Sequence, residues 1–141
     1  MHLFWVGMIK KIEHIGIAVA NLEESKALFR KLLGKPSYKE EAVQREGVIT
    51  SFFECGESKL ELLGSTSEQG VISKFIERKG QGIHHIALSV DNILTEITRL
   101  QADGFEFIDP IPKKGADNKL ICFIHPKSCN GILVELCQDL E

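Results

Sequence analysis

The chain contains two copies of one pattern, and each copy has a histidine and a glutamate at matching places. Residues 12–19 (IEHIGIAV) are matched by residues 83–90 (IHHIALSV) at an offset of 71, and residues 60–62 (LEL) by residues 134–136 (VEL) at an offset of 74. Since the offsets differ by only three positions, a whole module is duplicated rather than one short motif. Two copies packed about a pseudo-twofold axis bring four side chains to one point, which predicts a metal site. The four are His14, Glu61, His85 and Glu135.

Hydropathy and turn residues predict the same order of elements, β-α-β-β-β, in both copies. Each copy opens with a strand, at residues 10–19 in the first copy. The helix that follows is expected to begin after Asn21, an N-cap with Glu24 three residues on, and to end at Gly34. The remaining elements are expected at residues 37–42, 47–54 and 58–63 (strands), 67–79 (a linking helix), from Asp91 or Asn92 to Gly104 (the second helix), and 105–108, 119–125 and 131–138 (strands).

No long linker or low-complexity segment separates the copies, and residues 80–82 (GQG) mark their junction. We therefore expect one α+β body made of two tandem βαβββ modules. The first module, with the linking helix, covers residues 8–79, and the second covers residues 80–141. Residues 1–7 precede the first module; the sequence assigns them no role, and His2 is expected to have none.

The opening strand of each copy is expected to have one bulky face and one open face. Alternation along residues 10–19 places His14 beside Gly16 on one side and the larger aliphatic residues on the other. In the second copy, His85 lies beside Ala87 in the same way. Because a packed core requires volume, small residues beside a polar side chain indicate a concave face that is open to a ligand.

The two glutamates lie within apolar runs, where a carboxylate is costly to bury unless a positive charge compensates it. Lys59 is the one basic residue that alternates into those runs, so a divalent cation is the simplest partner for Glu61 and Glu135. Two imidazoles and two carboxylates suit Co, Ni, Zn or Mn in six-fold coordination with two open positions. Four protein ligands argue against the three-ligand site of non-haem iron oxygenases.

Composition excludes several classes of function. A chain of 141 residues with 43% hydrophobic residues has the size and composition of one globular domain. A net charge of −3 and a pI near 6.0 give no electrostatic footprint for nucleic acid or an anionic membrane. Apolar stretches are too short to span a bilayer, and no signal peptide is recognisable, so a cytoplasmic protein with reduced cysteines is expected.

Other polar residues are expected to be less central. His84 alternates with Ile86 and should face the helices, either in a structural role or in support of the metal ligands. His125 opens a turn and either lines the mouth of the pocket or is solvated. Cys137 shares a strand face with Glu135 but is not expected to be a ligand.

The sequence resembles the vicinal oxygen chelate superfamily and, within it, the methylmalonyl-CoA epimerases. The similarity spans about residues 8–138 and rests on residues 12–19, 59–63 (KLELL), 82–87 (GIHHIA) and 125–136. In the last segment an HPKS turn leads into GILVEL, whereas glyoxalase I relatives usually have an Asp-Pro-Asp-Gly type of turn there. The HPKS turn therefore discriminates best between the two groups.

The resemblance implies a half-open barrel of eight strands around a divalent metal ion, commonly in a homodimer. It implies His14, Glu61, His85 and Glu135 as the metal ligands. It further implies that the α-proton of methylmalonyl-CoA is removed to give a metal-stabilised enolate and is returned on the opposite face. Glu135 is the first candidate for acid–base catalysis, and Glu61 is the second. Some members have another glutamate where this chain has Thr50, which cannot act as a carboxylate base.

Two alternatives stay open at this stage. Glyoxalase I, which acts on a glutathione hemithioacetal, uses the same ligand types, and a metal-free small-molecule-binding protein can share the fold. A ring-cleaving dioxygenase is disfavoured by the second glutamate and the short chain. An acyl-CoA substrate could be met at its phosphates by surface lysines, although each of these is more simply solvated: Lys113, Lys114 and Lys127.

Overall fold

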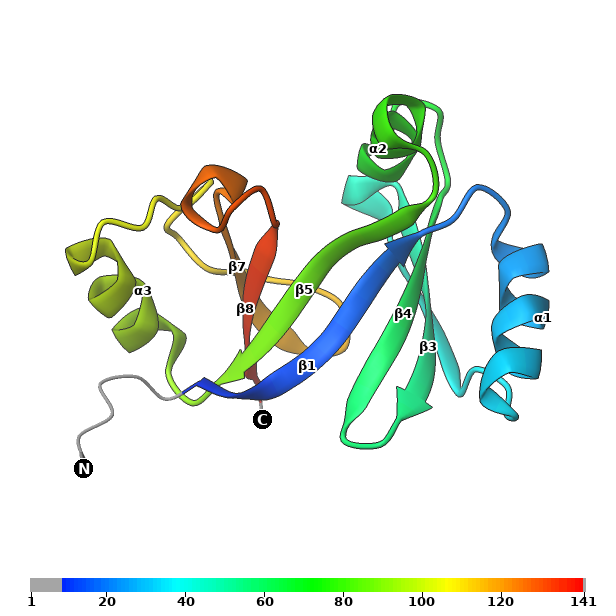
Figure 1. Ribbon diagram of the computed structural model, residues 1–141, viewed down its shortest axis with the longest axis horizontal. Helices are drawn as coiled ribbons and strands as arrows, with labels where there is room; N and C mark the ends of the chain where they lie inside the picture. The colour runs from blue at the N-terminus through cyan, green and yellow to red at the C-terminus, as the bar shows by residue number, and fades with distance from the viewer. Residues whose placement is uncertain (1–8, 141) are drawn as a thin grey trace. The chain divides into compact units, whose positions relative to one another are not determined.

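The computed structural model describes residues 9–140, which form eight strands, three α-helices and two short 3₁₀ turns (Figure 1). The elements are β1 (Ile9–Ala18), α1 (Leu22–Leu33), β2 (Lys39–Val43), η1 (Gln44–Glu46), β3 (Val48–Cys55), β4 (Ser58–Ser65), α2 (Val71–Lys79), β5 (Gly82–Val90), α3 (Ile93–Ala102), β6 (Lys113–Lys114), β7 (Lys119–Ile124), η2 (Pro126–Ser128) and β8 (Val134–Asp139). Residues 1–7, which precede the first predicted module, lie outside the residues that the structure describes. Within residues 9–140, no helix has the length and apolar character needed to cross a membrane.

The duplication is visible in the way the strands pair. The order is β2-β3-β4-β1 in one half of the chain and β6-β7-β8-β5 in the other. The opening strand of each half lies parallel to the closing strand, β1 beside β4 and β5 beside β8, and the other pairs are antiparallel. The predicted α+β class with two βαβββ modules is confirmed.

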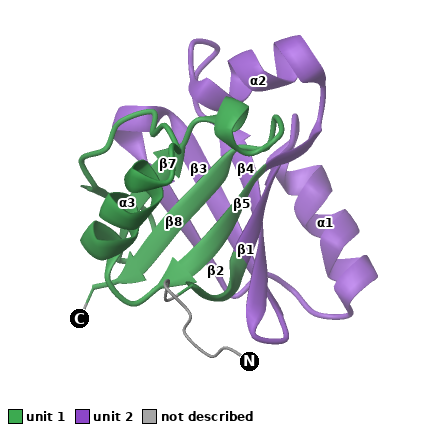
Figure 2. Ribbon diagram, turned by 60° about the vertical axis from the view of Figure 1, so that its left-hand side comes forward, with its two compact units in different colours: residues 1–13, 85–141 green, residues 14–84 purple. Residues whose placement is uncertain are grey.

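The chain divides into two compact units, coloured separately in Figure 2. Among the described residues, unit 1 comprises residues 9–13 and 85–140, and unit 2 comprises His14–His84. The chain thus passes from unit 1 to unit 2 within β1 and returns within β5. Each change of unit occurs immediately before a histidine that the sequence singled out.

The core of unit 2 has two layers, one on each face of its strands. Val19, Phe53 and Leu62 pack with apolar residues of α1, while Ala18 and Leu63 pack with Ile72 of α2. Successive residues of a strand point to opposite faces, so the bulky side of β1 faces α1 as predicted. The side with small residues is not wholly open, because α2 covers it beside Ala18.

The core of unit 1 has one layer between the strands and α3. Buried residues of α3 pack against aliphatic side chains of β5, β7 and β8. The opposite strand face of this unit includes Ala87, His85 and Glu135. This face is the one on which the sequence places the candidate ligands.

The helix caps agree with the sequence. The Asn21 side chain accepts a hydrogen bond from the Glu24 backbone N–H at 3.0 Å, and the Asn92 side chain accepts one from Thr95 at 3.0 Å. Gly34 ends α1 with φ = 78°, a left-handed conformation that glycine adopts at little cost.

Two predicted boundaries are wrong, each because a turn extends further than the hydropathy suggests. The linking helix begins at Val71 rather than at residue 67, since residues 67–70 form a turn in which Gly70 donates to the Ser67 carbonyl. The final strand begins at Val134 rather than at residue 131, since Asn130 and Gly131 have positive φ angles of 55° and 86°.

The strand predicted at residues 105–108 is reduced to a single bridge between Phe107 and Ile124. The strand at this edge is instead the two-residue β6. Pro110 and Pro112 have no backbone N–H to donate, so the chain between Phe107 and β6 does not continue a ladder.

We expect Asn21→Ala and Asn92→Ala each to lower the free energy of unfolding by about 1 kcal/mol, because each removes a cap from a helix N-terminus. Urea unfolding followed by circular dichroism measures this change. Asn21→Ser is the matched control and should retain most of the stability, since a serine hydroxyl also caps. An equal loss in the serine variant would show that the cap is not the cause.

Candidate metal centre

In unit 2, strand register places His14 and Glu61 on the same face. Gly16 of β1 lies directly opposite Glu61 of β4, and His14 is two residues before Gly16, so its side chain projects to the same side. The Nδ1 atom of His14 lies 3.1 Å from Oε2 of Glu61, and both side chains are buried.

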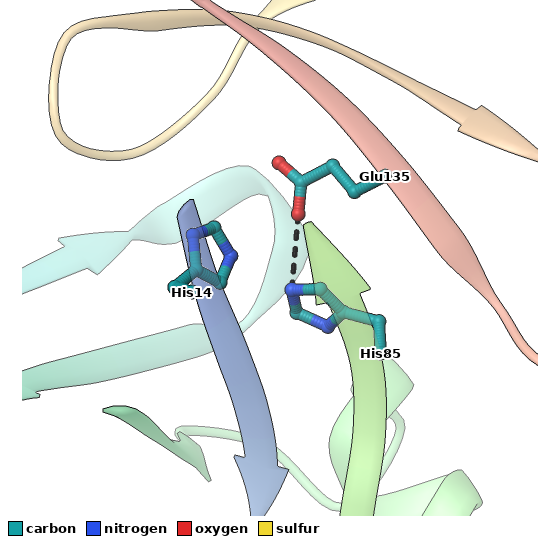
Figure 3. Close-up of side chains that lie close together, drawn as sticks. All are labelled: His14, His85 and Glu135. Atoms are coloured by element: carbon teal, nitrogen blue, oxygen red, sulfur yellow. Dashed lines mark ion pairs between the residues drawn. The ribbon is translucent and has the colours of Figure 1, made fainter. Parts of the chain in front are cut away.

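Unit 1 repeats this arrangement. Ala87 of β5 lies opposite Glu135 of β8, and His85 is two residues before Ala87. The Nε2 atom of His85 lies 3.0 Å from Oε1 of Glu135, and both side chains are again buried; Figure 3 shows this ion pair as a dashed line. The structure therefore brings the four predicted residues together as two equivalent pairs, one in each unit.

A phenylalanine accompanies each pair, which the sequence reasoning missed. Phe52 lies opposite Glu61, and Phe123 lies opposite Glu135, on the neighbouring antiparallel strands. The ring of Phe123 meets that of His85 edge to face, with 5.8 Å between the centroids. The two phenylalanines are 71 positions apart, the same offset as the histidines, and that spacing is the signal that could have found them.

The donor atoms of the pairs suit a divalent cation. Burial disfavours a carboxylate without a compensating positive charge, and each glutamate here has one imidazole within 3.1 Å. Imidazole nitrogen and carboxylate oxygen are ligands that first-row divalent metals accept. Each pair therefore fits half of the expected site, and the meeting of both pairs at one ion stays a prediction.

Thr50 lies on the face of unit 2 that includes Glu61. It is buried on β3, opposite Leu63 of β4 and Glu41 of β2. Because Thr50 is two residues from Phe52, its side chain points to the same side as that of Phe52. The place where some relatives of the predicted family have a glutamate is thus occupied by a hydroxyl group.

A buried ion pair in unit 1 was also missed. Glu13 of β1 and Lys119 of β7 are both buried, and Oε2 of Glu13 lies 3.8 Å from Nζ of Lys119. The sequence signal for this pair was weak, because Glu13 and Lys119 are single charged residues next to apolar residues. Glu13 directly precedes His14 in the chain.

Within residues 9–140, the two remaining histidines make local contacts. The ring of His84 packs edge to face on Phe75 of α2, with 4.8 Å between the ring centroids, so the predicted orientation toward a helix is confirmed. Nδ1 of His125 accepts a hydrogen bond from the backbone N–H of Lys127 and caps the turn of residues 126–128.

Two of the lysines considered for phosphate binding already have acidic partners. Nζ of Lys127 lies 2.9 Å from Oε1 of Glu106, and this ammonium group lowers the pKa of the Glu106 carboxyl. Nζ of Lys113 lies 3.4 Å from Oδ2 of Asp109. A phosphate at either lysine would compete with these carboxylates.

Comparison with known proteins agrees with the family resemblance that the sequence shows. Residues 13–123 match the family model described as the glyoxalase/bleomycin resistance protein/dioxygenase superfamily. The mitochondrial methylmalonyl-CoA epimerase of Dictyostelium discoideum is 40% identical over 129 residues, which cover 91% of this chain and 78% of that protein. The ethylmalonyl-CoA/methylmalonyl-CoA epimerase of Cereibacter sphaeroides is 38% identical, over 93% of this chain and 99% of that protein.

A crystal structure shows the same likeness in three dimensions. The methylmalonyl-CoA epimerase from Mycobacterium tuberculosis matches with a TM-score of 0.91 at 27% identity, over 99% of this chain and 95% of that one. This agreement confirms the predicted fold class over nearly the whole chain.

We expect Cys122 to be unreactive in the folded protein, because burial raises the pKa of its thiol to about 11 and the reactive form is the thiolate. Cys55 is exposed and should be alkylated by iodoacetamide at about pH 8. Mass spectrometry of the labelled peptides measures both, with Cys55→Ser as the control that removes the fast label. Rapid labelling of Cys122 without denaturant would contradict the buried position.

Proposed function

The chain belongs to the glyoxalase/bleomycin resistance protein/dioxygenase superfamily and, within it, to the methylmalonyl-CoA epimerases, and on this premise we propose that it inverts the α-carbon of methylmalonyl-CoA. The observation that supports this most directly is the buried His–Glu pair that occurs once in each module. The epimerase names of two relatives at 38–40% identity point to the same chemistry.

We further propose that both pairs bind one divalent ion together, with His14, Glu61, His85 and Glu135 as its ligands. The duplication supports this, because equivalent residues of two modules meet readily at a pseudo-twofold axis. When bound, the ion supplies Lewis acidity toward the two oxygens that flank the reacting carbon and so stabilises negative charge there. Co, Ni, Zn and Mn all suit the donor set.

Within this proposal, Glu135 is the group that removes the α-proton. Its carboxylate accepts the proton, the C–H bonding electrons pass into the enolate of the substrate, and Glu135 becomes a carboxylic acid. Inversion requires that a proton then return to the opposite face of the carbon. We assign this second proton transfer to Glu61. Thr50 occupies the position where some family members have a glutamate, and its hydroxyl group cannot act as a carboxylate base.

The alternatives gain less support from these observations. A metal-free binding protein has no need of two buried His–Glu pairs. Glyoxalase I uses similar ligands, but both reported relatives are named as acyl-CoA epimerases. A homodimer and a cytoplasmic location stay predictions.

The decisive measurement is solvent deuterium exchange at the α-carbon. The apoprotein, reloaded separately with Co, Ni, Zn or Mn, should invert methylmalonyl-CoA and introduce one deuterium in heavy water. The chelated apoprotein should do neither. Conversion of a glutathione hemithioacetal without any exchange into methylmalonyl-CoA would establish the glyoxalase I alternative instead.

The roles of the two glutamates are separable. We expect Glu135→Gln and Glu61→Gln each to reduce inversion by about 10²–10⁴-fold, the usual contribution of one general acid–base group. Each variant should still exchange deuterium into the one epimer that the remaining carboxylate reaches, without inverting it. NMR of the recovered thioester measures exchange and configuration together. Inversion by Glu61→Gln at the parental rate would exclude Glu61 as the second group.

A further inference from the structure

Lys119 is a buried cation to which the proposed reaction gives no role. Its side chain is only 11% exposed, and that of Glu13, 3.8 Å away, is 7% exposed. Both residues belong to unit 1, although they are more than one hundred positions apart in the chain. Taking two charges out of water is costly, and a buried ion pair is often no more stabilising than apolar residues of similar volume. Stability alone therefore gives a weak reason for this pair.

The partners of Lys119 are not equivalent. Asp139 also contacts its ammonium group, but the Asp139 side chain is 77% exposed and lies at the end of β8. Asp117 lies 3.9 Å from it, in the turn before β7. Glu13 is the partner that is both buried and part of β1.

Glu13 lies at the point where β1 changes unit. The register of β1 with β4 begins at His14, which is opposite Lys59, and Glu13 belongs to unit 1. The peptide bond between Glu13 and His14 therefore joins a residue fixed by Lys119 to a candidate ligand. Whatever holds the Glu13 carboxylate also restricts the backbone from which the His14 imidazole projects.

We infer that the Glu13–Lys119 pair is a positioning device for His14, an inference that rests on the metal site of the proposed function. Lys119 holds Glu13, and Glu13 fixes the position and direction of the following histidine. Residues that orient metal ligands typically affect metal affinity or activity by about 10–100-fold. The pair should therefore control how tightly the protein binds a metal ion, in addition to its effect on folding.

Cobalt(II) binding tests this inference without any turnover. Lys119→Met and Glu13→Gln should each weaken cobalt binding by about tenfold or more in equilibrium dialysis. Both should also alter the visible cobalt absorption bands, which report ligand geometry. Lys119→Arg keeps the charge and should restore most of the affinity.

Asp139→Asn is the matched control, because it removes another direct partner of Lys119 without changing β1. We expect parental cobalt affinity in this variant. Circular dichroism and thermal unfolding of every variant show whether it is folded, and Glu13→Asp, which keeps the charge but shortens the side chain, replaces Glu13→Gln if the latter does not fold. Glu13→Asp should give an intermediate loss of affinity.

The outcomes separate this inference from the proposed function. A parental protein that binds no cobalt would overturn the proposed metal site itself. A parental protein that binds cobalt, with Lys119→Met and Glu13→Gln matching it in affinity and spectrum, would overturn only the positioning role. A fall in thermal stability alone would do the same, as would an equal loss of affinity in Asp139→Asn.

Discussion

The site depends on the register between the opening and closing strands of each half. In a parallel pair, a residue two positions before the partner of a glutamate points to the same face as that glutamate. His14 and His85 both stand in this relation to Glu61 and Glu135. A shift by one residue in either register would turn the histidine toward the helix and leave a buried carboxylate without its imidazole.

The surroundings of the two glutamates bear on the proposed proton abstraction. Phe52 and Phe123 lie opposite the two glutamates on the neighbouring strands, and both glutamates are buried. For a buried carboxylate, electrostatic interactions with a cation or an imidazole are stronger than they are in water. Because both members of each His–Glu pair are buried, the pair is sensitive to any change that removes one partner.

The core and the candidate ligands occupy opposite faces of the strands in unit 1 and in much of unit 2. Bulky aliphatic residues pack against α1 and α3, and the candidate ligands share their strand faces with Gly16 and Ala87. Packing on one face thus fixes the strands, and the other face is available for chemistry. At the Ala18 end, residues of α2 pack on the second face as well.

The sequence by itself determined the duplicated βαβββ order, the helix caps at Asn21 and Asn92, and the choice of four His and Glu residues as candidate ligands. These follow from alternation, capping chemistry and an internal repeat, all of which can be read directly along the chain. The pairing of each histidine with its own glutamate needed the parallel register of strands about 45 to 50 positions apart, which no local pattern encodes. The positions of Phe52 and Phe123 opposite the glutamates also depend on the pairing of strands, and the Glu13–Lys119 contact joins residues that are distant in the chain. The strand expected at residues 105–108 failed for a related reason, since its ladder depended on a partner and on the prolines that follow it. Tertiary structure decided these features because strand pairing joins segments that are distant in the chain. Local sequence does not specify which strands pair or in what register.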